Sequence, residues 1–179
     1  MNTTYNIQTL CGQLDRMEIS TNDFVEGCTR QIARAVGCSR AGIWLFLDAR
    51  QGTILHCLGV FDRHAGAVVQ VPDEPRTHVE AYFDALEQAG HVMAEDVHAH
   101  PATAGLFDRA ANAADERSLM AASFAVNGRL FGAFTCTETG RTKAWTQNDL
   151  ATLRRIGGRA SLALAGATQM RQTTMPMPL

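Results

Sequence analysis

An Asn-Gly dipeptide at positions 127 and 128 separates two mainly apolar runs, residues 118–126 and 129–137. Asn-Gly is the preferred pair for a two-residue type I′ turn, in which both residues adopt a positive φ. The turn predicts that the two runs are adjacent antiparallel strands. If the two-residue loop sets the register, Phe124 pairs with Phe131 and Ala122 pairs with Ala133 on one face.

Three other segments have apolar residues three and four positions apart, which predicts amphipathic helices. They are residues 20–37, 79–90 and 145–167. The first and third begin with the sequence of a capping box, Ser20 with Asp23 and Thr146 with Asp149. Gly37 is expected to end the first helix.

Four further short runs rich in apolar, aromatic and β-branched residues predict strands. They are residues 40–47, 53–60, 67–71 and 91–97. The predicted order is helix, three strands, helix, strand, a loop with a short helix, two strands and a long helix. This order is typical of an α+β fold in one domain, as a length of 179 residues allows.

Composition excludes several classes of protein. The formal net charge of −2 lacks the basic excess of a nucleic-acid-binding protein, so no nucleic-acid partner is expected. No stretch has the roughly 18 apolar residues that a membrane span requires, and the N-terminus does not resemble a signal peptide. The sequence therefore predicts a cytoplasmic protein with no membrane partner.

The five cysteines are widely and irregularly spaced, with no Cys-x-x-Cys pair. Neither a disulfide framework nor a zinc site has this spacing. Reduced and mostly buried thiols are expected at Cys11, Cys28, Cys38, Cys57 and Cys136.

A carboxylate and two imidazoles alternate at Asp96, His98 and His100, just before Pro101. In an extended chain these side chains project to one side and could converge on a metal ion. They supply only three ligands, and no second cluster completes a structural site, so the sequence predicts no metal. Asp96 could instead cap the following helix or close a turn, or it could contact a ligand. Both alternatives stay open.

Three stretches of the sequence resemble the GAF domain family, which consists of small-molecule-sensing modules related to PAS domains. They are GCSRAGIWLF, AYFDALEQAGHVMAEDVHAHP and NGRLFGAFTCTETGRTKAWTQNDLATLRRIGGRASLAL. The last is the most specific, since a strand running into TG-x-x-x-x-W before the final helix is similar to bacterial signalling GAF domains. The resemblance covers roughly residues 21–167.

The resemblance implies an α+β fold with a GAF/PAS-like central antiparallel sheet of about six strands. The terminal helices would pack on one face of this sheet, and a ligand pocket would lie on the other. The expected division is an N-terminal helical extension (1–20), a GAF-like sensory domain (21–167) and a flexible tail or linker (168–179). Relatives often form homodimers through the terminal helices and often precede a histidine kinase or GGDEF-type cyclase output domain, so such partners are expected.

The same resemblance places Asp96 at the end of a strand and puts His98 and His100 on the loop over the pocket. The expected ligand-binding residues are Tyr82, Phe83, Asp96, His98, His100, Phe107 and Phe124. The aromatic residues among them could instead be ordinary core, because regularly spaced aromatic side chains often are.

The resemblance implies a regulatory domain that senses a small molecule or transmits a signal, with no catalytic activity and no cofactor. One alternative is an enzyme similar to the GAF proteins that reduce free methionine sulfoxide. That chemistry needs cysteines on the pocket loops, and this chain has none between Cys57 and Cys136, which also argues against a covalently attached bilin. A second alternative is a pure dimerisation module with a closed pocket.

Overall fold

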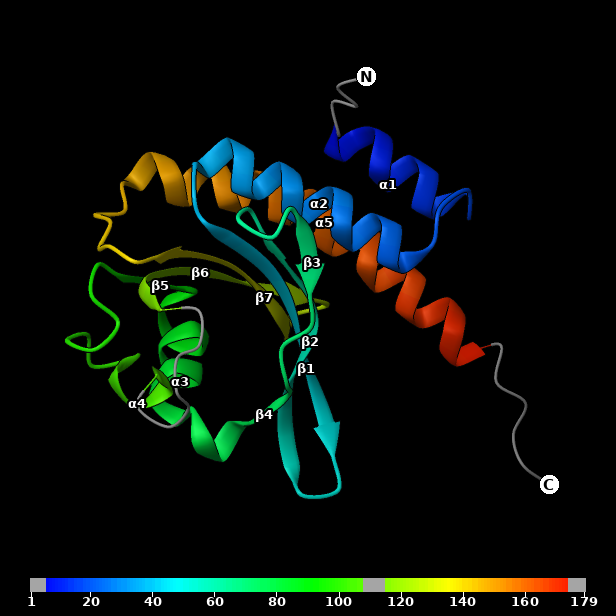
Figure 1. The fold of residues 1–179 in the computed structure, drawn as a ribbon. Coiled ribbons are helices and arrows are strands. Elements are labelled where there is room, and N and C mark those ends of the chain that lie inside the picture. The colour runs from blue at the N-terminus through cyan, green and yellow to red at the C-terminus, as the bar shows by residue number, and fades with distance from the viewer. Residues whose placement is uncertain (1–5, 108–114, 174–179) are drawn as a thin grey trace.

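The computed structural model describes residues 6–107 and 115–173 and shows a single antiparallel sheet with helices on both faces (Figure 1). The elements are α1 (Ile7–Asp15), α2 (Thr21–Val36), β1 (Arg40–Ala49), β2 (Gly52–Asp62), β3 (Ala67–Val69), β4 (Glu74–Pro75), the 3₁₀ helix η1 (Arg76–His78), α3 (Glu80–Ala89), β5 (His91–Ala94), α4 (Ala104–Phe107), β6 (Glu116–Val126), β7 (Arg129–Thr139) and α5 (Gln147–Thr173). The expected α+β class and central antiparallel sheet are confirmed.

The strands are ordered β3-β2-β1-β7-β6-β5, and the short β4 pairs with β2. Every pairing is antiparallel. Helices α1, α2 and α5 lie on one face of the sheet, and α3 and α4 lie on the other (Figure 1). The terminal helices therefore share one face, as expected.

The predicted capping boxes are present. The Ser20 hydroxyl accepts a hydrogen bond from the Asp23 backbone N–H at 3.1 Å, and the Asp23 carboxylate accepts one from the Ser20 N–H at 3.0 Å. Thr146 and Asp149 form the same reciprocal pair at the start of α5. Gly37 ends α2 with a φ of 73°, a left-handed conformation that glycine adopts without strain.

The Asn127-Gly128 turn forms as predicted, with both residues at positive φ. The predicted register holds only for the first two pairs and is wrong beyond them. A bulge between Phe124 and Ala125 shifts the strands, so that Phe124 pairs with Gly132 and Ala122 pairs with Phe134.

Glycine at position 132 explains the shifted register. A Cβ at Gly132 would lie 2.7 Å from the Phe124 ring and would also collide with the Trp44 carbonyl oxygen. The ring can therefore lie over this position only because the side chain is absent. The shift turns Phe134 toward the terminal helices and Ala133 toward the opposite face.

Helix α5 lies against the sheet along its small and apolar residues. The predicted stripe is buried within the chain, at Leu150, Leu153, Gly157, Ala160 and Leu164. A Cβ at Gly157 would lie 2.6 Å from the ring of Phe134, whereas a Cβ at Gly158 would meet nothing within 4 Å. Absence of a side chain at Gly157 thus sets how closely α5 approaches β7.

Helix α5 runs to Thr173, so the expected boundary at residue 168 falls inside a helix. The expected N-terminal extension contains α1, whose Ile7, Leu10 and Leu14 are buried in the core formed with α2 and α5. Of the helices in the described ranges, none combines the length and apolar character needed to cross a membrane.

Candidate ligand cavity

A cavity of about 510 Å³ lies on the face of the sheet opposite the terminal helices. Its apolar wall comes from the central strands, the segment after β3 and helix α4, at Trp44, Phe46, Leu55, Val60, Val71, Pro72, Leu106, Phe107, Leu119 and Ala133. Its polar wall consists of Arg40, Asp62, Gln70, Glu74, Tyr82, Glu116, Thr135 and Thr137. The cavity is therefore amphipathic, as small-molecule sites commonly are.

The period-two alternation of β1 explains how one strand serves both the cavity and the core. Arg40, Trp44 and Phe46 line the cavity, whereas Ile43 and Leu45 belong to the core under the terminal helices. Successive side chains of a strand point to opposite faces, so the even positions of β1 face the cavity. Strand β7 alternates in the same way beyond its bulge.

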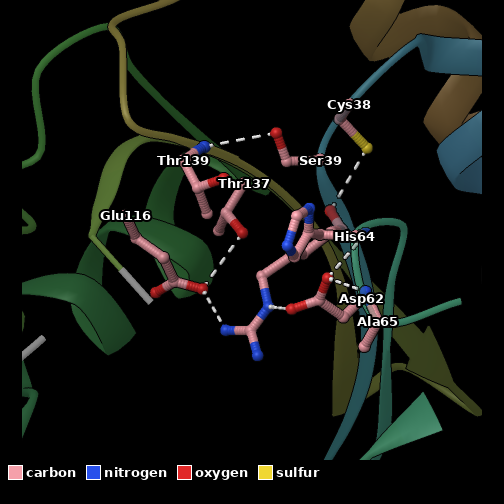
Figure 2. Close-up of polar contacts among 9 residues, drawn as sticks. Cys38, Ser39, Asp62, His64, Ala65, Glu116, Thr137 and Thr139 are labelled. Atoms are coloured by element: carbon pink, nitrogen blue, oxygen red, sulfur yellow. Dashed lines mark hydrogen bonds and ion pairs between the residues drawn. The ribbon is translucent and has the colours of Figure 1, made fainter. Parts of the chain in front are cut away.

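At the polar end, Arg40 lies between the carboxylates of Asp62 and Glu116, both of which Figure 2 labels. Its Nε donates to Asp62 Oδ2 at 2.9 Å, and its Nη1 donates to Glu116 Oε1 at 3.0 Å. The Thr137 hydroxyl also donates to Glu116 Oε1, at 3.1 Å. The exposed fractions of the Arg40, Asp62 and Glu116 side chains are 13%, 20% and 17%. We call Arg40, Asp62, Glu116 and Thr137 the Arg40 cluster.

The pKa of Asp62 is lowered overall. Partial burial alone would raise this pKa, but hydrogen bonds from the backbone N–H groups of Ala65 and His64 and the charge of Arg40 outweigh the effect of burial. The two N–H groups reach Asp62 Oδ1 at 3.1 and 2.8 Å (Figure 2). Asp62 is therefore ionised at neutral pH.

Two hydroxyls line the cavity without a hydrogen-bond partner among the described residues, those of Tyr82 and Thr135. Tyr82 is 5% exposed and Thr135 is 7% exposed. Burial raises the pKa of Tyr82, and the nearby Glu116 charge raises it further. The Tyr82 hydroxyl thus keeps its proton, and both hydroxyls can donate and accept hydrogen bonds within the cavity.

Of the seven predicted site residues, Tyr82 and Phe107 line this cavity. Phe83 lies beside it, in contact with Phe46 at a ring-centroid distance of 4.9 Å and beneath the Arg76 guanidinium at 4.0 Å. Phe124 lies on the opposite face, where its ring packs against Phe134. The structure therefore separates Phe124 from the other aromatic residues of the predicted site.

The Asp96, His98 and His100 side chains do not line the cavity. Asp96 Oδ1 accepts a hydrogen bond from the His98 backbone N–H at 3.0 Å, and His100 Nδ1 accepts one from the Ala102 N–H at 3.2 Å. Asp96 thus closes a turn, the structural alternative that the sequence left open. Within residues 6–107 and 115–173, no three His, Cys, Asp or Glu side chains are grouped to hold a metal ion.

Sequence reasoning missed the Arg40 cluster and Thr135. Arg40 could have been predicted from the alternation of side chains along the first strand, because this alternation puts Arg40 on the same face as Trp44 and Phe46. No comparable signal pointed to Asp62 or Glu116, because their proximity to Arg40 depends on strand pairing across the sheet.

All five cysteines are free thiols, and none lines the cavity. Cys57, on the neighbouring strand β2, is buried, and burial raises its pKa. Burial also raises the pKa of Cys28, in the core under the terminal helices. Nucleophilic thiols have lowered pKa values, so neither thiol is activated.

Known structures share this fold at low sequence identity. The chain is similar to the GAF domain from Acinetobacter phosphoenolpyruvate-protein phosphotransferase, with 12% identity and a TM-score of 0.69 over 96% of this chain and 95% of that chain. It is similar to the phycocyanobilin-bound GAF domain from a cyanobacterial phytochrome, with 13% identity and a TM-score of 0.67 over 92% and 97%. It is also similar to free methionine-R-sulfoxide reductase from Neisseria meningitidis in complex with its substrate, with 16% identity and a TM-score of 0.63 over 95% of each chain.

No curated protein matches the chain by sequence. These three structural matches, at identities of 12–16%, concern the fold alone. The family model described as GAF domain matches residues 20–164, which is most of the chain. With this match and the shared architecture, the chain belongs to the GAF domain family.

Proposed function

We propose that this chain is a regulatory sensory domain that binds a small molecule without covalent attachment and without catalysing a reaction. The observation that carries the proposal is the cavity of about 510 Å³, whose wall combines apolar side chains with the Arg40 cluster and the hydroxyls of Tyr82 and Thr135. A concave, largely apolar cavity with a few polar groups is the usual form of a small-molecule site. The bilin-bound GAF domain among the similar structures supports the same kind of role.

Thiol placement supports a binding domain over an enzyme of the reductase type. Thiol-dependent reduction requires a thiolate that can reach the substrate. None of the cysteines lines the cavity, and burial raises the pKa of Cys57, which lies on the adjacent strand. The open volume likewise supports a ligand-binding domain over a dimerisation module with a closed pocket.

We expect native mass spectrometry of the freshly purified protein to detect a retained small molecule. The variants Tyr82→Ala and Phe107→Ala should lose that molecule, since each removes part of the cavity wall. Tyr82→Ala should also cost roughly 3 kcal/mol of unfolding free energy, the usual effect of deleting a buried aromatic side chain.

Phe124→Leu is the matched control, because Phe124 is an aromatic residue on the other face of the sheet. This variant should be less stable than the wild type but should retain the ligand. Unchanged ligand occupancy in folded Tyr82→Ala and Phe107→Ala protein would contradict the assignment of the cavity.

We further propose that the domain acts in the cytoplasm as a homodimer and regulates a kinase or cyclase output domain. The apolar stripe of α5 is buried within the chain, so a dimer would have to use the outer face of the helix, where Leu162 is 73% exposed. Sedimentation velocity at tens of micromolar should show a dimer, and Leu162→Lys should shift it toward monomer. A wild-type monomer at this concentration would contradict the homodimer.

A further inference from the structure

One wall of the cavity is a single layer of chain. Residues 70–75, which we call the strap, run along β2 from the end of β3 through β4 (Figure 1). Four residues of the strap line the cavity, namely Gln70, Val71, Pro72 and Glu74. Gln70 and Pro72 are also exposed. The strap therefore separates this part of the cavity from solvent with no second layer behind it.

Strand pairing holds the strap to β2 at its two ends. Just before the strap, β3 pairs with β2 over three residues. At its far end, Leu55 pairs with Glu74 and Ile54 pairs with Pro75. Residues 70–73 lie between these two pairings and belong to neither. Segments with few main-chain contacts open locally at a lower free energy than core strands, so this middle part is expected to open before the strands around it.

The Asp73 side chain fastens the middle part of the strap. Both of its carboxylate oxygens lie 2.9 Å from His56 Nδ1. Its Oδ1 also accepts a hydrogen bond from the backbone N–H of Cys57 at 3.1 Å. His56 and Cys57 both belong to β2. Loss of the Asp73 carboxylate would therefore leave the strap attached to β2 mainly through the short pairings at its ends.

The Cys57 thiol lies beneath the same stretch of chain. Cys57 is 4% exposed, and burial raises its pKa. The backbone N–H of Val71 is close enough to the thiol to offset part of this effect by stabilising the thiolate. Because Val71 belongs to the strap, displacement of the strap would uncover Cys57. The reactivity of this native thiol therefore reports whether the strap is open.

We propose that the strap opens as a unit when the contacts of Asp73 with β2 break, and that this opening is the route by which a ligand enters and leaves the cavity. The inference rests on the proposed function and specifies how access to the same site is controlled. Removal of the Asp73 carboxylate should raise the open population about tenfold, the effect of losing one hydrogen bond to a charged group.

Alkylation by iodoacetamide tests the inference without a ligand. Mass spectrometry of the peptides follows two thiols, native Cys57 and the thiol that Ala133→Cys places on the cavity wall, where Ala133 is 1% exposed. When alkylation is slower than reclosing of the strap, its rate is proportional to the open population. Asp73→Ala should therefore raise the rate at both thiols about tenfold.

Two controls separate opening of the strap from a general loss of stability. Cys28 is fully buried in the core on the other face of the sheet, so its alkylation rate should not change in Asp73→Ala. Asp15→Ala removes an exposed carboxylate from α1, on that same face, and should leave all three rates at their wild-type values. Leu119→Cys provides a second thiol on the cavity wall if Ala133→Cys does not fold.

An unchanged rate at Cys57 in Asp73→Ala would overturn the inference. A faster rate at Cys57 with an unchanged rate at the cavity thiol would overturn it too, because the strap would then open without admitting the reagent to the cavity. Either result would leave the proposed function intact, since retention of a small molecule in native mass spectrometry is measured separately. Faster rates at both thiols would support the strap even if no molecule were retained, and that absence would count against the proposed function alone.

Discussion

Gly157→Ala is expected to lower the unfolding free energy by about 2 kcal/mol, the usual range for an extra methyl group in a packed core. The new Cβ would lie 2.6 Å from the Phe134 ring, which is fully buried and also packs against Phe124. Either α5 moves away from β7 or the ring leaves its position. The gain in helix propensity from alanine, up to about 1 kcal/mol, does not offset this collision.

Gly158→Ala supplies a matched control one residue further along the same helix. A Cβ at Gly158 meets nothing within 4 Å and projects from the exposed side of α5. The same substitution should therefore raise the unfolding free energy by about 0.5–1 kcal/mol. Urea unfolding followed by circular dichroism measures both variants. Equal effects at the two positions would contradict the close approach of α5 to β7.

Arg40→Met should be strongly destabilising, at about 3 kcal/mol near neutral pH. The methionine fills similar space but removes the guanidinium that pairs with both Asp62 and Glu116, whose side chains are 20% and 17% exposed. Arg129→Met is the control, because the Arg129–Asp48 pair is exposed and exposed pairs contribute little. Its unfolding free energy should be nearly that of the wild type.

The Arg40→Met defect should shrink in acid. The lowered pKa of Asp62 in the folded wild type stabilises the protein above the unfolded pKa of about 4, and this stabilisation is lost as the pH falls through the folded value. Without Arg40 the Asp62 carboxylate gains a proton more readily, and a protonated Asp62 no longer needs the guanidinium that the variant lacks. Unfolding curves from pH 7 to pH 3 should therefore converge for variant and wild type. A defect of constant size would show that lost packing, and not charge, is responsible.

Local chemistry explains why much of the fold is predictable from the sequence. The turn at Asn127-Gly128, the capping boxes at Ser20 and Thr146 and the end of α2 at Gly37 each depend on a few neighbouring residues. The register beyond Ala125 does not depend on neighbouring residues alone. It depends on the absence of a side chain at Gly132, where a Cβ would collide with the Phe124 ring. This contact becomes visible only when the strands are paired.

The candidate site was predictable only in part, for the same reason. Helical spacing puts Tyr82 and Phe83 on the inner side of one helix, but it does not reveal that only Tyr82 reaches the cavity. The strand period could have indicated Arg40. Its partners, Asp62 and Glu116, are 22 and 76 residues away in the sequence, and only the folded sheet brings them together.

The alternation of β1 has an evolutionary consequence. Substitutions at positions 44 and 46 alter the chamber where a ligand would lie, while the residues that hold the terminal helices, at 43 and 45, stay as they are. The positions that would set ligand specificity and the positions that stabilise the core thus alternate along the same strand. A lineage can exchange one recognised compound for another by mutating alternate residues, and each intermediate protein keeps the core that folds it.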